Sequence, residues 1–187
     1  MNTDEKSIRE QLDDLVQDKS PSNYVQYQHA NTCQTPCLKC EEFYKRVFQY
    51  SQRQKVAQHL GCDCYYSIVL IKPLGSVSKK GLFGPDVWLK LFGKLPDYYI
   101  TKEDARAIGW AKGKDLSQIA PNKMIGGDIY SNKERLLPEK TGRIWYECDI
   151  DYESGKRGSA RLYYSNDGLM FYSPDHLFGE VKIFQVK

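Results

Sequence analysis

The feature that most restricts the fold is a change of hydrophobic period near Gly126. From there to the C-terminus, short apolar runs are separated by Gly, Asn, Asp or Pro, as in strands joined by turns. The expected strands lie at 128–131, 143–152, 160–164, 169–173 and 180–186.

Helices are expected ahead of these strands. The first, in PDVWLKLFGKLP, has an apolar face and ends near Gly93. The second begins at Thr101 as N-cap, has Asp104 at the capping-box position and ends at Gly109. A short third helix is expected at 115–120. Helices followed by an antiparallel sheet predict the α+β class.

The cysteines indicate a second module. Five of the six lie between Cys33 and Cys64, whereas Cys148 lies alone in a predicted strand. We therefore expect a small Cys-rich module at 1–80 and a second domain at 81–187. The first module is expected to be mainly helical. Its predicted elements are helices at 7–16 and 41–61, a buried strand at 65–71 and a linker in KPLGSVSKKG.

The cysteine spacing favours a structural zinc site in this module, because a small core gains from a metal staple. The expected ligands are Cys37, Cys40, Cys62 and Cys64, with His59 as a substitute. Disulfides or free thiols, which would also involve Cys33, are the alternative, but five cysteines cannot all pair among themselves.

Charge and hydropathy exclude some classes of function. The net charge of the 187-residue chain is only +3 and is spread over both halves, so nucleic-acid contact requires a local cluster. No apolar run approaches the roughly 18 residues of a membrane helix. The charged N-terminus also does not resemble a signal peptide. Nothing in the sequence implies an oligomer.

The segment IWYECDIDYESGKRGSARLYY predicts a charged hairpin. A three-residue ESG loop would place Glu147 opposite Arg161 and Asp151 opposite Arg157, and Asp149 would share their outward face. A carboxylate between guanidinium groups is suited to proton abstraction beside a bound phosphate. The alternative is a ladder of exposed ion pairs with no catalytic role. In both interpretations Asp149 and Asp151 are expected to be structural.

Three further features point to a site. His176 follows a Pro-Asp turn, where it is expected to be exposed and available for proton transfer. Lys102 lies in the first turn of a helix, where the helix dipole disfavours a cation. The loop GGDIYSNKE combines flexible glycines with polar side chains beside a carboxylate.

These residues, in this order, resemble the barnase-like family of microbial guanyl-preferring ribonucleases. The similarity covers about residues 83–187. It is carried by KLPDYYITKEDARAIGW, IAPNKMIGGDIYSNKE, LPEKTGRIWYECDIDYESGKRGSARLYYS and PDH. Three positions differ from the family pattern: Lys133, where arginine is expected, Gly168, where tryptophan is expected, and Leu177, where an aromatic residue is usual.

The resemblance implies a catalytic set for metal-independent RNA cleavage. Glu147 would be the general base for the ribose 2′-hydroxyl, and His176 the general acid for the leaving 5′-oxygen. Arg157 and Arg161 would bind the phosphate, and Lys102 would stabilise its developing charge. Arginines beside the glutamate would favour its ionised form. The product would be a 2′,3′-cyclic phosphate, which the same pair can hydrolyse.

The resemblance also implies a base-binding loop and a partner. Ser131, Asn132, Lys133 and Glu134 match the guanine-binding loop, which requires single-stranded RNA. The family often pairs with a small acidic inhibitor of the barstar type, so a similar partner is expected. The expected target is cytoplasmic RNA, reached in the producing cell or after delivery.

The cysteine segment gives a second, shorter resemblance. The spacing C-x2-C followed by H-x2-C-x-C is similar to the tail of Mu-type phage head-morphogenesis proteins over about 30 residues. Fusion of such proteins to toxins would make this chain a delivered toxin. The rival interpretations are a phage structural protein and an inactive RNA-binding module of the same fold.

Overall fold

The structure, a computed structural model, describes residues 22–28, 42–53, 64–177 and 183–187. It divides into two compact units, each with its own sheet. The small unit contains the described residues from 22 to 70 together with 132–142. The large unit contains 71–131 and the described part of 143–187.

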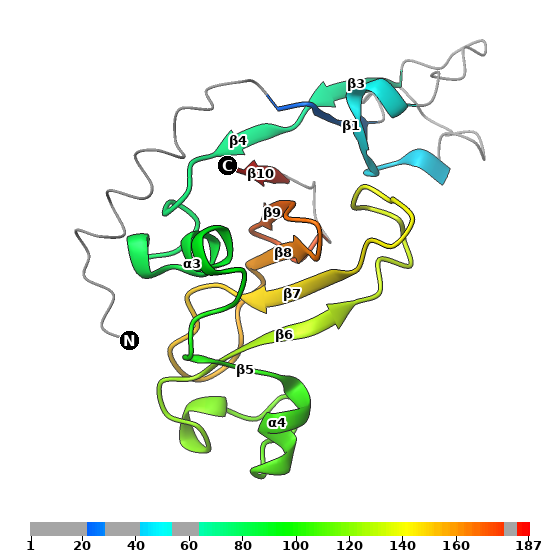
Figure 1. The fold of residues 1–187 in the computed structure, drawn as a ribbon. Coiled ribbons are helices and arrows are strands. Elements are labelled where there is room, and N and C mark those ends of the chain that lie inside the picture. The colour runs from blue at the N-terminus through cyan, green and yellow to red at the C-terminus, as the bar shows by residue number, and fades with distance from the viewer. Residues whose placement is uncertain (1–21, 29–41, 54–63, 178–182) are drawn as a thin grey trace. The chain divides into compact units, whose positions relative to one another are not determined.

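The large unit is built on a seven-stranded sheet with the order β4-β10-β9-β8-β7-β6-β5 (Figure 1). Pairing is antiparallel from β10 to β6, and β5 runs parallel to β6. The bounds are β4 Leu70–Lys72, β5 Tyr99–Ile100, β6 Met124–Tyr130, β7 Trp145–Asp149, β8 Arg161–Ser165, β9 Met170–Ser173 and β10 Phe184–Val186. The strands expected from Gly126 onward are therefore confirmed, with shorter or shifted ends.

Two α-helices precede β6 in the chain, as predicted. Helix α3 (Pro85–Phe92) ends at Gly93, whose φ of 67° suits glycine in the left-handed region. Helix α4 (Lys102–Ala107) begins after Thr101, whose side chain accepts a hydrogen bond from the Asp104 amide. The third predicted helix is a single 3-10 turn, η3 (Leu116–Gln118), and another, η2 (Gly81–Phe83), precedes α3.

Apolar clusters form the core of the large unit, and two of them lie against its sheet. One gathers Trp110, Leu116 and Ile125 between α4, η3 and β6. The other gathers Cys148 and Leu162 on one face of β7 and β8, with Val77, Ile150, Met170 and Val186 around them. Val77 lies inside the predicted linker, yet it is buried in this core. The domain boundary at residue 80 stays a prediction.

The predicted hairpin register is wrong by two residues, which leaves each side chain on its predicted face but changes its partner. Asp149 lies opposite Arg161, and Glu147 lies opposite Tyr163. The strands are joined by residues 150–160 and not by a three-residue ESG loop. Two residues beyond the end of β7, Asp151 has a φ of 54° and accepts hydrogen bonds from Ser78 and the Lys79 amide.

The predicted outward face of β7 is also buried. Trp145, Glu147 and Asp149 do lie on one face, as expected, but they are only 4%, 9% and 2% exposed. Because the carboxylates are shielded from water, the alternative of exposed ion pairs does not describe Glu147 or Asp149.

The small unit has a three-stranded antiparallel sheet with the order β2-β1-β3. Its strands are β1 Tyr24–Gln28, β2 Val47–Gln49 and β3 Tyr65–Ile68, and the 3-10 turn η1 (Tyr50–Gln52) follows β2. Edge-to-face aromatic contacts join Tyr27, Phe43, Phe48 and Tyr66 in its core, beside buried Cys64.

Within the helix predicted at 41–61, the described residues Glu42 and Phe43 are helical, but the prediction is wrong over 44–53. Lys45 has a φ of 64°, which is incompatible with a continuing helix, and Val47 begins a strand that pairs with β1. Burial of aromatic side chains in the sheet outweighs the helical spacing. The helix predicted at 7–16 lies outside the described residues.

The strand expected at 65–71 forms as β3 and β4, interrupted at Val69, but most of it is not buried. Ile68 and Leu70 are 68% and 63% exposed, whereas Val69 is buried.

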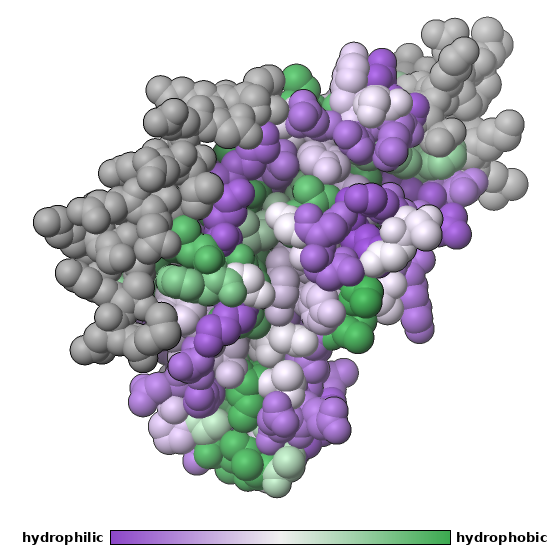
Figure 2. All heavy atoms as spheres, viewed as in Figure 1, coloured by the Kyte–Doolittle hydropathy of each residue, from purple (hydrophilic) through white to green (hydrophobic). Residues whose placement is uncertain are grey.

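On the face of the molecule in Figure 2, hydrophobic and hydrophilic residues are interspersed, and apolar side chains gather at the end where α4 lies. Among the described residues, no helix is long and apolar enough to cross a membrane.

Candidate active site

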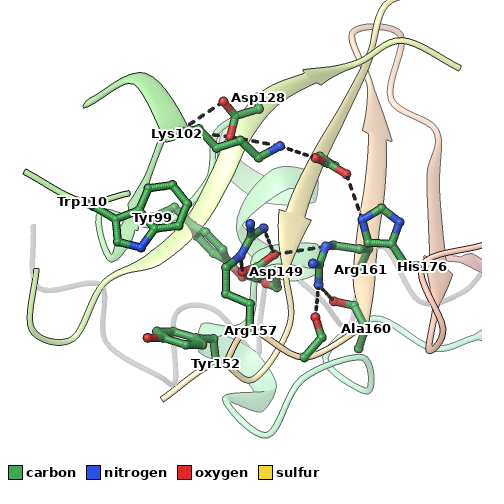
Figure 3. Close-up of polar contacts among 12 residues, drawn as sticks. Tyr99, Lys102, Trp110, Asp128, Asp149, Tyr152, Arg157, Ala160, Arg161 and His176 are labelled. Carbon is green, nitrogen blue, oxygen red and sulfur yellow. Dashed lines mark hydrogen bonds and ion pairs between the residues drawn. The ribbon is translucent and has the colours of Figure 1, made fainter. Parts of the chain in front are cut away.

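Lys102 pairs with two carboxylates of the candidate site, those of Glu147 and Asp128, and Figure 3 labels Lys102 and Asp128. The Lys102 ammonium donates to Glu147 Oε1 at 2.6 Å and lies 3.9 Å from Asp128 Oδ2. Asp128 also accepts from the Lys102 amide with both oxygens, at 3.1 Å each. Two carboxylates thus offset the unfavourable position of a lysine at the start of α4.

Glu147 also faces His176. His176 Nε2 lies 3.9 Å from Glu147 Oε2, and the imidazole side chain is 30% exposed. His176 and Leu177 have φ values of 60° and 62°, a left-handed pair that turns the chain after β9. The Leu177 amide donates to Ser173 Oγ at 3.0 Å, which anchors this turn. Two potential proton-transfer groups therefore lie side by side.

Both predicted phosphate-binding arginines converge on Asp149. Arg157 donates from Nε and Nη2 to the two carboxylate oxygens, and Arg161 Nε lies 3.1 Å from Oδ1. Arg161 Nη1 also donates to the Gly158 and Ala160 carbonyls at 2.7 Å. Burial would lower the pKa of Arg157, but the hydrogen bonds to Asp149 raise it on balance.

The structure therefore brings all five predicted catalytic residues into one cluster of the large unit: Lys102, Glu147, Arg157, Arg161 and His176. It corrects the pairing within that cluster, because Arg157 binds Asp149 and not Asp151. The interpretation of Asp149 and Asp151 as structural agrees with their contacts.

The predicted base-binding residues are divided between the units: Ser131 belongs to the large unit, whereas Asn132, Lys133 and Glu134 belong to the small unit. A turn begins at Asn132, whose carbonyl accepts from the Arg135 amide at 2.8 Å. Asn132 is buried, exchanges two hydrogen bonds of 3.0 Å with the Leu137 backbone, and has a φ of 46°. Ser131, Lys133 and Glu134 are exposed. Asn132 therefore holds the shape of the loop, and the residues on either side of it, Ser131 and Lys133, are exposed.

The predicted zinc site falls largely outside the described residues. That applies to Cys33, Cys37, Cys40, His59 and Cys62. Cys64 is described and is buried beside Tyr27. Within the described part of the chain, no three His, Cys, Asp or Glu side chains are grouped as a metal site would require. Zinc binding stays a prediction.

Two residues of the cluster were missed by the sequence analysis. Asp128 was visible only as part of a polar loop, although it binds both the amide and the ammonium of Lys102. Tyr163 was read as an ordinary strand residue, although it lies opposite Glu147. The signal for Tyr163 depends on the strand register, which a local turn motif did not give correctly.

Part of the chain is similar to known ribonucleases. Residues 90–181 match the model of a protein family described as ribonuclease. Over 90 residues, the chain is 49% identical to ribonucleases of Heyndrickxia coagulans, Bacillus intermedius and Bacillus pumilus. This match covers 48% of the present chain, 83% of the first relative and 56% of each of the other two. The chain therefore belongs to the barnase-like family of microbial ribonucleases.

Proposed function

We propose that the chain is an endoribonuclease that cleaves single-stranded RNA by general acid and base catalysis, with its catalytic residues in the large unit. The observation that carries this proposal is the position of Glu147 between Lys102 and His176, at 2.6 and 3.9 Å. An acid, a base and a cation are thus already grouped where a phosphodiester would bind.

Glu147 is the proposed base. Its Oε1 accepts from Lys102, whereas its Oε2 makes no hydrogen bond to a described residue. That oxygen would take the proton of the ribose 2′-hydroxyl, which then attacks phosphorus. His176 would donate its proton to the 5′-oxygen as the P–O5′ bond breaks, leaving a 2′,3′-cyclic phosphate and a free 5′-hydroxyl.

The arginines supply donors for the phosphate. A guanidinium has five N–H donors. The bonds to Asp149 use Nε and Nη2 of Arg157, so its two Nη1 donors are free of contacts with described residues. Asp149 thus orients the Arg157 guanidinium and leaves its Nη1 donors available for a phosphate. Together with Lys102, these donors would stabilise the charge that develops on the phosphate oxygens, a role that requires no metal ion.

Guanine preference is the finer part of the proposal. The exposed Glu134 carboxylate in the turn held by Asn132 suits the N1 and N2 donors of guanine, and neighbouring backbone amides suit O6. Cleavage of otherwise identical oligonucleotides with a single G or a single A would measure this preference. Glu134→Gln is expected to reduce the difference.

The decisive experiment is incubation of the full chain with RNA in EDTA. Wild type is expected to produce 2′,3′-cyclic phosphate ends, and Glu147→Gln and His176→Ala are expected to lose most of this activity. Glu153→Gln, a change at an exposed glutamate in the same unit, serves as the matched control. No cleavage by wild type, or equal cleavage by all variants, contradicts the proposal.

The biological role follows as a hypothesis. A cell containing an active ribonuclease of this family needs protection, which supports a toxin acting on cytoplasmic RNA and a small acidic barstar-type inhibitor. Loss of cleavage upon addition of such an inhibitor, with formation of a one-to-one complex, would support this role. Copurification with phage head proteins without RNA cleavage would favour the structural alternative.

A further inference from the structure

Tyr163 lies in the proposed site without a role in the mechanism above. It is the residue directly opposite Glu147 in the pairing of β7 and β8, so both side chains lie on the same face of the sheet. Side chains of such opposed pairs are close enough to interact. The Tyr163 side chain is fully buried, at 0% exposure.

Two aromatic neighbours fix the Tyr163 ring. The Tyr130 ring lies against it with centroids 4.7 Å apart, and the His176 ring meets it edge to face at 6.5 Å. On the next strand, Phe171 is its opposed residue. The tyrosine ring therefore contacts the proposed acid and lies beside the proposed base.

The polar ends of this pair are complementary but unjoined. The Tyr163 hydroxyl is buried and makes no hydrogen bond to any described residue, and the same is true of Glu147 Oε2. Buried polar groups are paired in the large majority of cases. A donor and an acceptor on opposed residues thus both lack a partner while Lys102 holds the other oxygen of the carboxylate.

We propose that Tyr163 is a positioning residue for Glu147: when RNA occupies the site, its hydroxyl donates a hydrogen bond to the carboxylate and keeps it ionised and oriented. This inference rests on the proposed function, because it requires Lys102 to turn from Glu147 toward the bound phosphate. Tyr163 would then replace the donor that Glu147 loses. Tyr163 keeps its own proton throughout.

The charged neighbours of Glu147 determine how this should appear in a pH profile. Lys102 on α4, the arginines and protonated His176 favour the ionised carboxylate, whereas the nearby carboxylates disfavour it. Among the described residues, the groups around the pair are Lys102, Asp128, Tyr130, Asp149, Arg157, Arg161, Asp175 and His176. Only the contact with Lys102 is expected to change when phosphate binds.

The test compares wild type with Tyr163→Phe, which removes one oxygen atom and keeps the buried ring. The pH profile of kcat/KM reports the free enzyme, whereas that of kcat reports the substrate complex. Because the hydrogen bond forms only in the complex, we expect the acid limb of kcat to move up by about one pH unit. This is a loss of about tenfold on that limb, and the acid limb of kcat/KM should stay in place.

Tyr164→Phe is the matched control, since its ring lies on the opposite face of the same strand. It should move neither limb. An unchanged kcat limb in Tyr163→Phe, or an equal movement of both limbs, overturns the inference.

Absence of cleavage by wild type would contradict the proposed function, and a second measurement then decides the role of Tyr163. The carboxyl ¹³C signal of Glu147 can be titrated with saturating inorganic phosphate and without it. A titration that shifts to higher pH in Tyr163→Phe only with phosphate bound supports the hydrogen bond. The same titration in both proteins excludes it.

Discussion

Arg157 holds Asp149 through two parallel hydrogen bonds, from Nε to Oδ2 at 2.6 Å and from Nη2 to Oδ1 at 2.7 Å. Arg161 Nε lies 3.1 Å from the same Oδ1. One carboxylate, only 2% exposed, therefore orients both arginines proposed to bind the phosphate. Such planar pairing fixes the geometry of the guanidinium groups before RNA arrives.

Asp149→Asn is expected to lower the free energy of unfolding by about 3 kcal/mol, because two shielded cations lose their common counterion. Urea denaturation at neutral pH measures this change. Asp167→Asn is the control. It weakens the pair with Arg143, in which the aspartate side chain is 30% exposed, and should cost about 1 kcal/mol or less. Equal losses in the two variants contradict a special role for Asp149.

Lys102→Gln is expected to reduce kcat/KM for RNA cleavage by about 100-fold, the effect of removing one donor to a developing oxyanion. Glu147 and Asp128 position the Lys102 ammonium. A glutamine side chain is neutral and cannot supply that positive charge. Initial rates on one oligonucleotide measure the change. Lys112→Gln, at an exposed lysine, should leave the rate as it is; a similar loss there would indicate nonspecific attraction of RNA.

Gly126→Ala is expected to destabilise the large unit by about 3 kcal/mol. An added Cβ would lie 2.5 Å from both Cys148 Cβ and Tyr99 Cδ1, a distance that forces buried groups apart. Thermal and urea denaturation measure the loss. Gly158→Ala is the comparison, because its Cβ would meet nothing within 4 Å. If both variants keep wild-type stability, β6 and β7 do not pack this closely at Gly126.

Local signals in the sequence predicted much of the large unit. Thr101 caps α4 through the Asp104 amide, and Gly93 ends α3 in the left-handed conformation. Each signal acts within a few residues, so it can be read without knowing the rest of the fold. The alternating strands were found for the same reason, and their antiparallel order followed from the intervening turns.

Predictions failed where distant residues decide the structure. Asp151 bonds to Ser78 and Lys79, more than 70 positions earlier, which helps to hold residues 150–160 as a long loop despite a plausible short turn. In the small unit, aromatic packing around Tyr27 overrides the helical spacing near Val47. Neither the hydrogen bonds of Asp151 nor the packing around Tyr27 can be predicted from the local hydrophobic period.

The candidate site shows the same division. The residue types and motif order identified Glu147 and His176, but their 3.9 Å separation depends on a turn after β9. Tyr163 was not predicted as a site residue, because only the pairing of β7 with β8 places it opposite Glu147. A register error of two residues was enough to place Arg161 in that position instead.

Asp86 provides a prediction for the pH dependence of stability. It is fully buried near the start of α3 and accepts from the Gly75 amide at 2.6 Å. Burial outweighs this hydrogen bond and raises the pKa of Asp86 to about 6, from 3.8 for the free side chain. Between pH 4 and 6, the folded protein therefore binds more protons at this site than the unfolded chain, and stability falls as pH rises.

The contribution of Asp86 should be small below pH 4 and should reach a cost of about 3 kcal/mol above pH 6, from a pKa difference of about two units. Asp86→Asn stays neutral, so its stability relative to wild type should increase through this window, as measured by urea denaturation at several pH values.

Asp115→Asn is the control of opposite sign. Hydrogen bonds from Ser117 and Tyr152 lower the pKa of Asp115 to about 2, so its stabilising effect is lost only as the pH falls below 4. Its stability difference should thus be flat between pH 4.5 and 6.5. A flat difference for Asp86→Asn over the same range means that the Asp86 carboxylate is already ionised in the folded protein at pH 4.5.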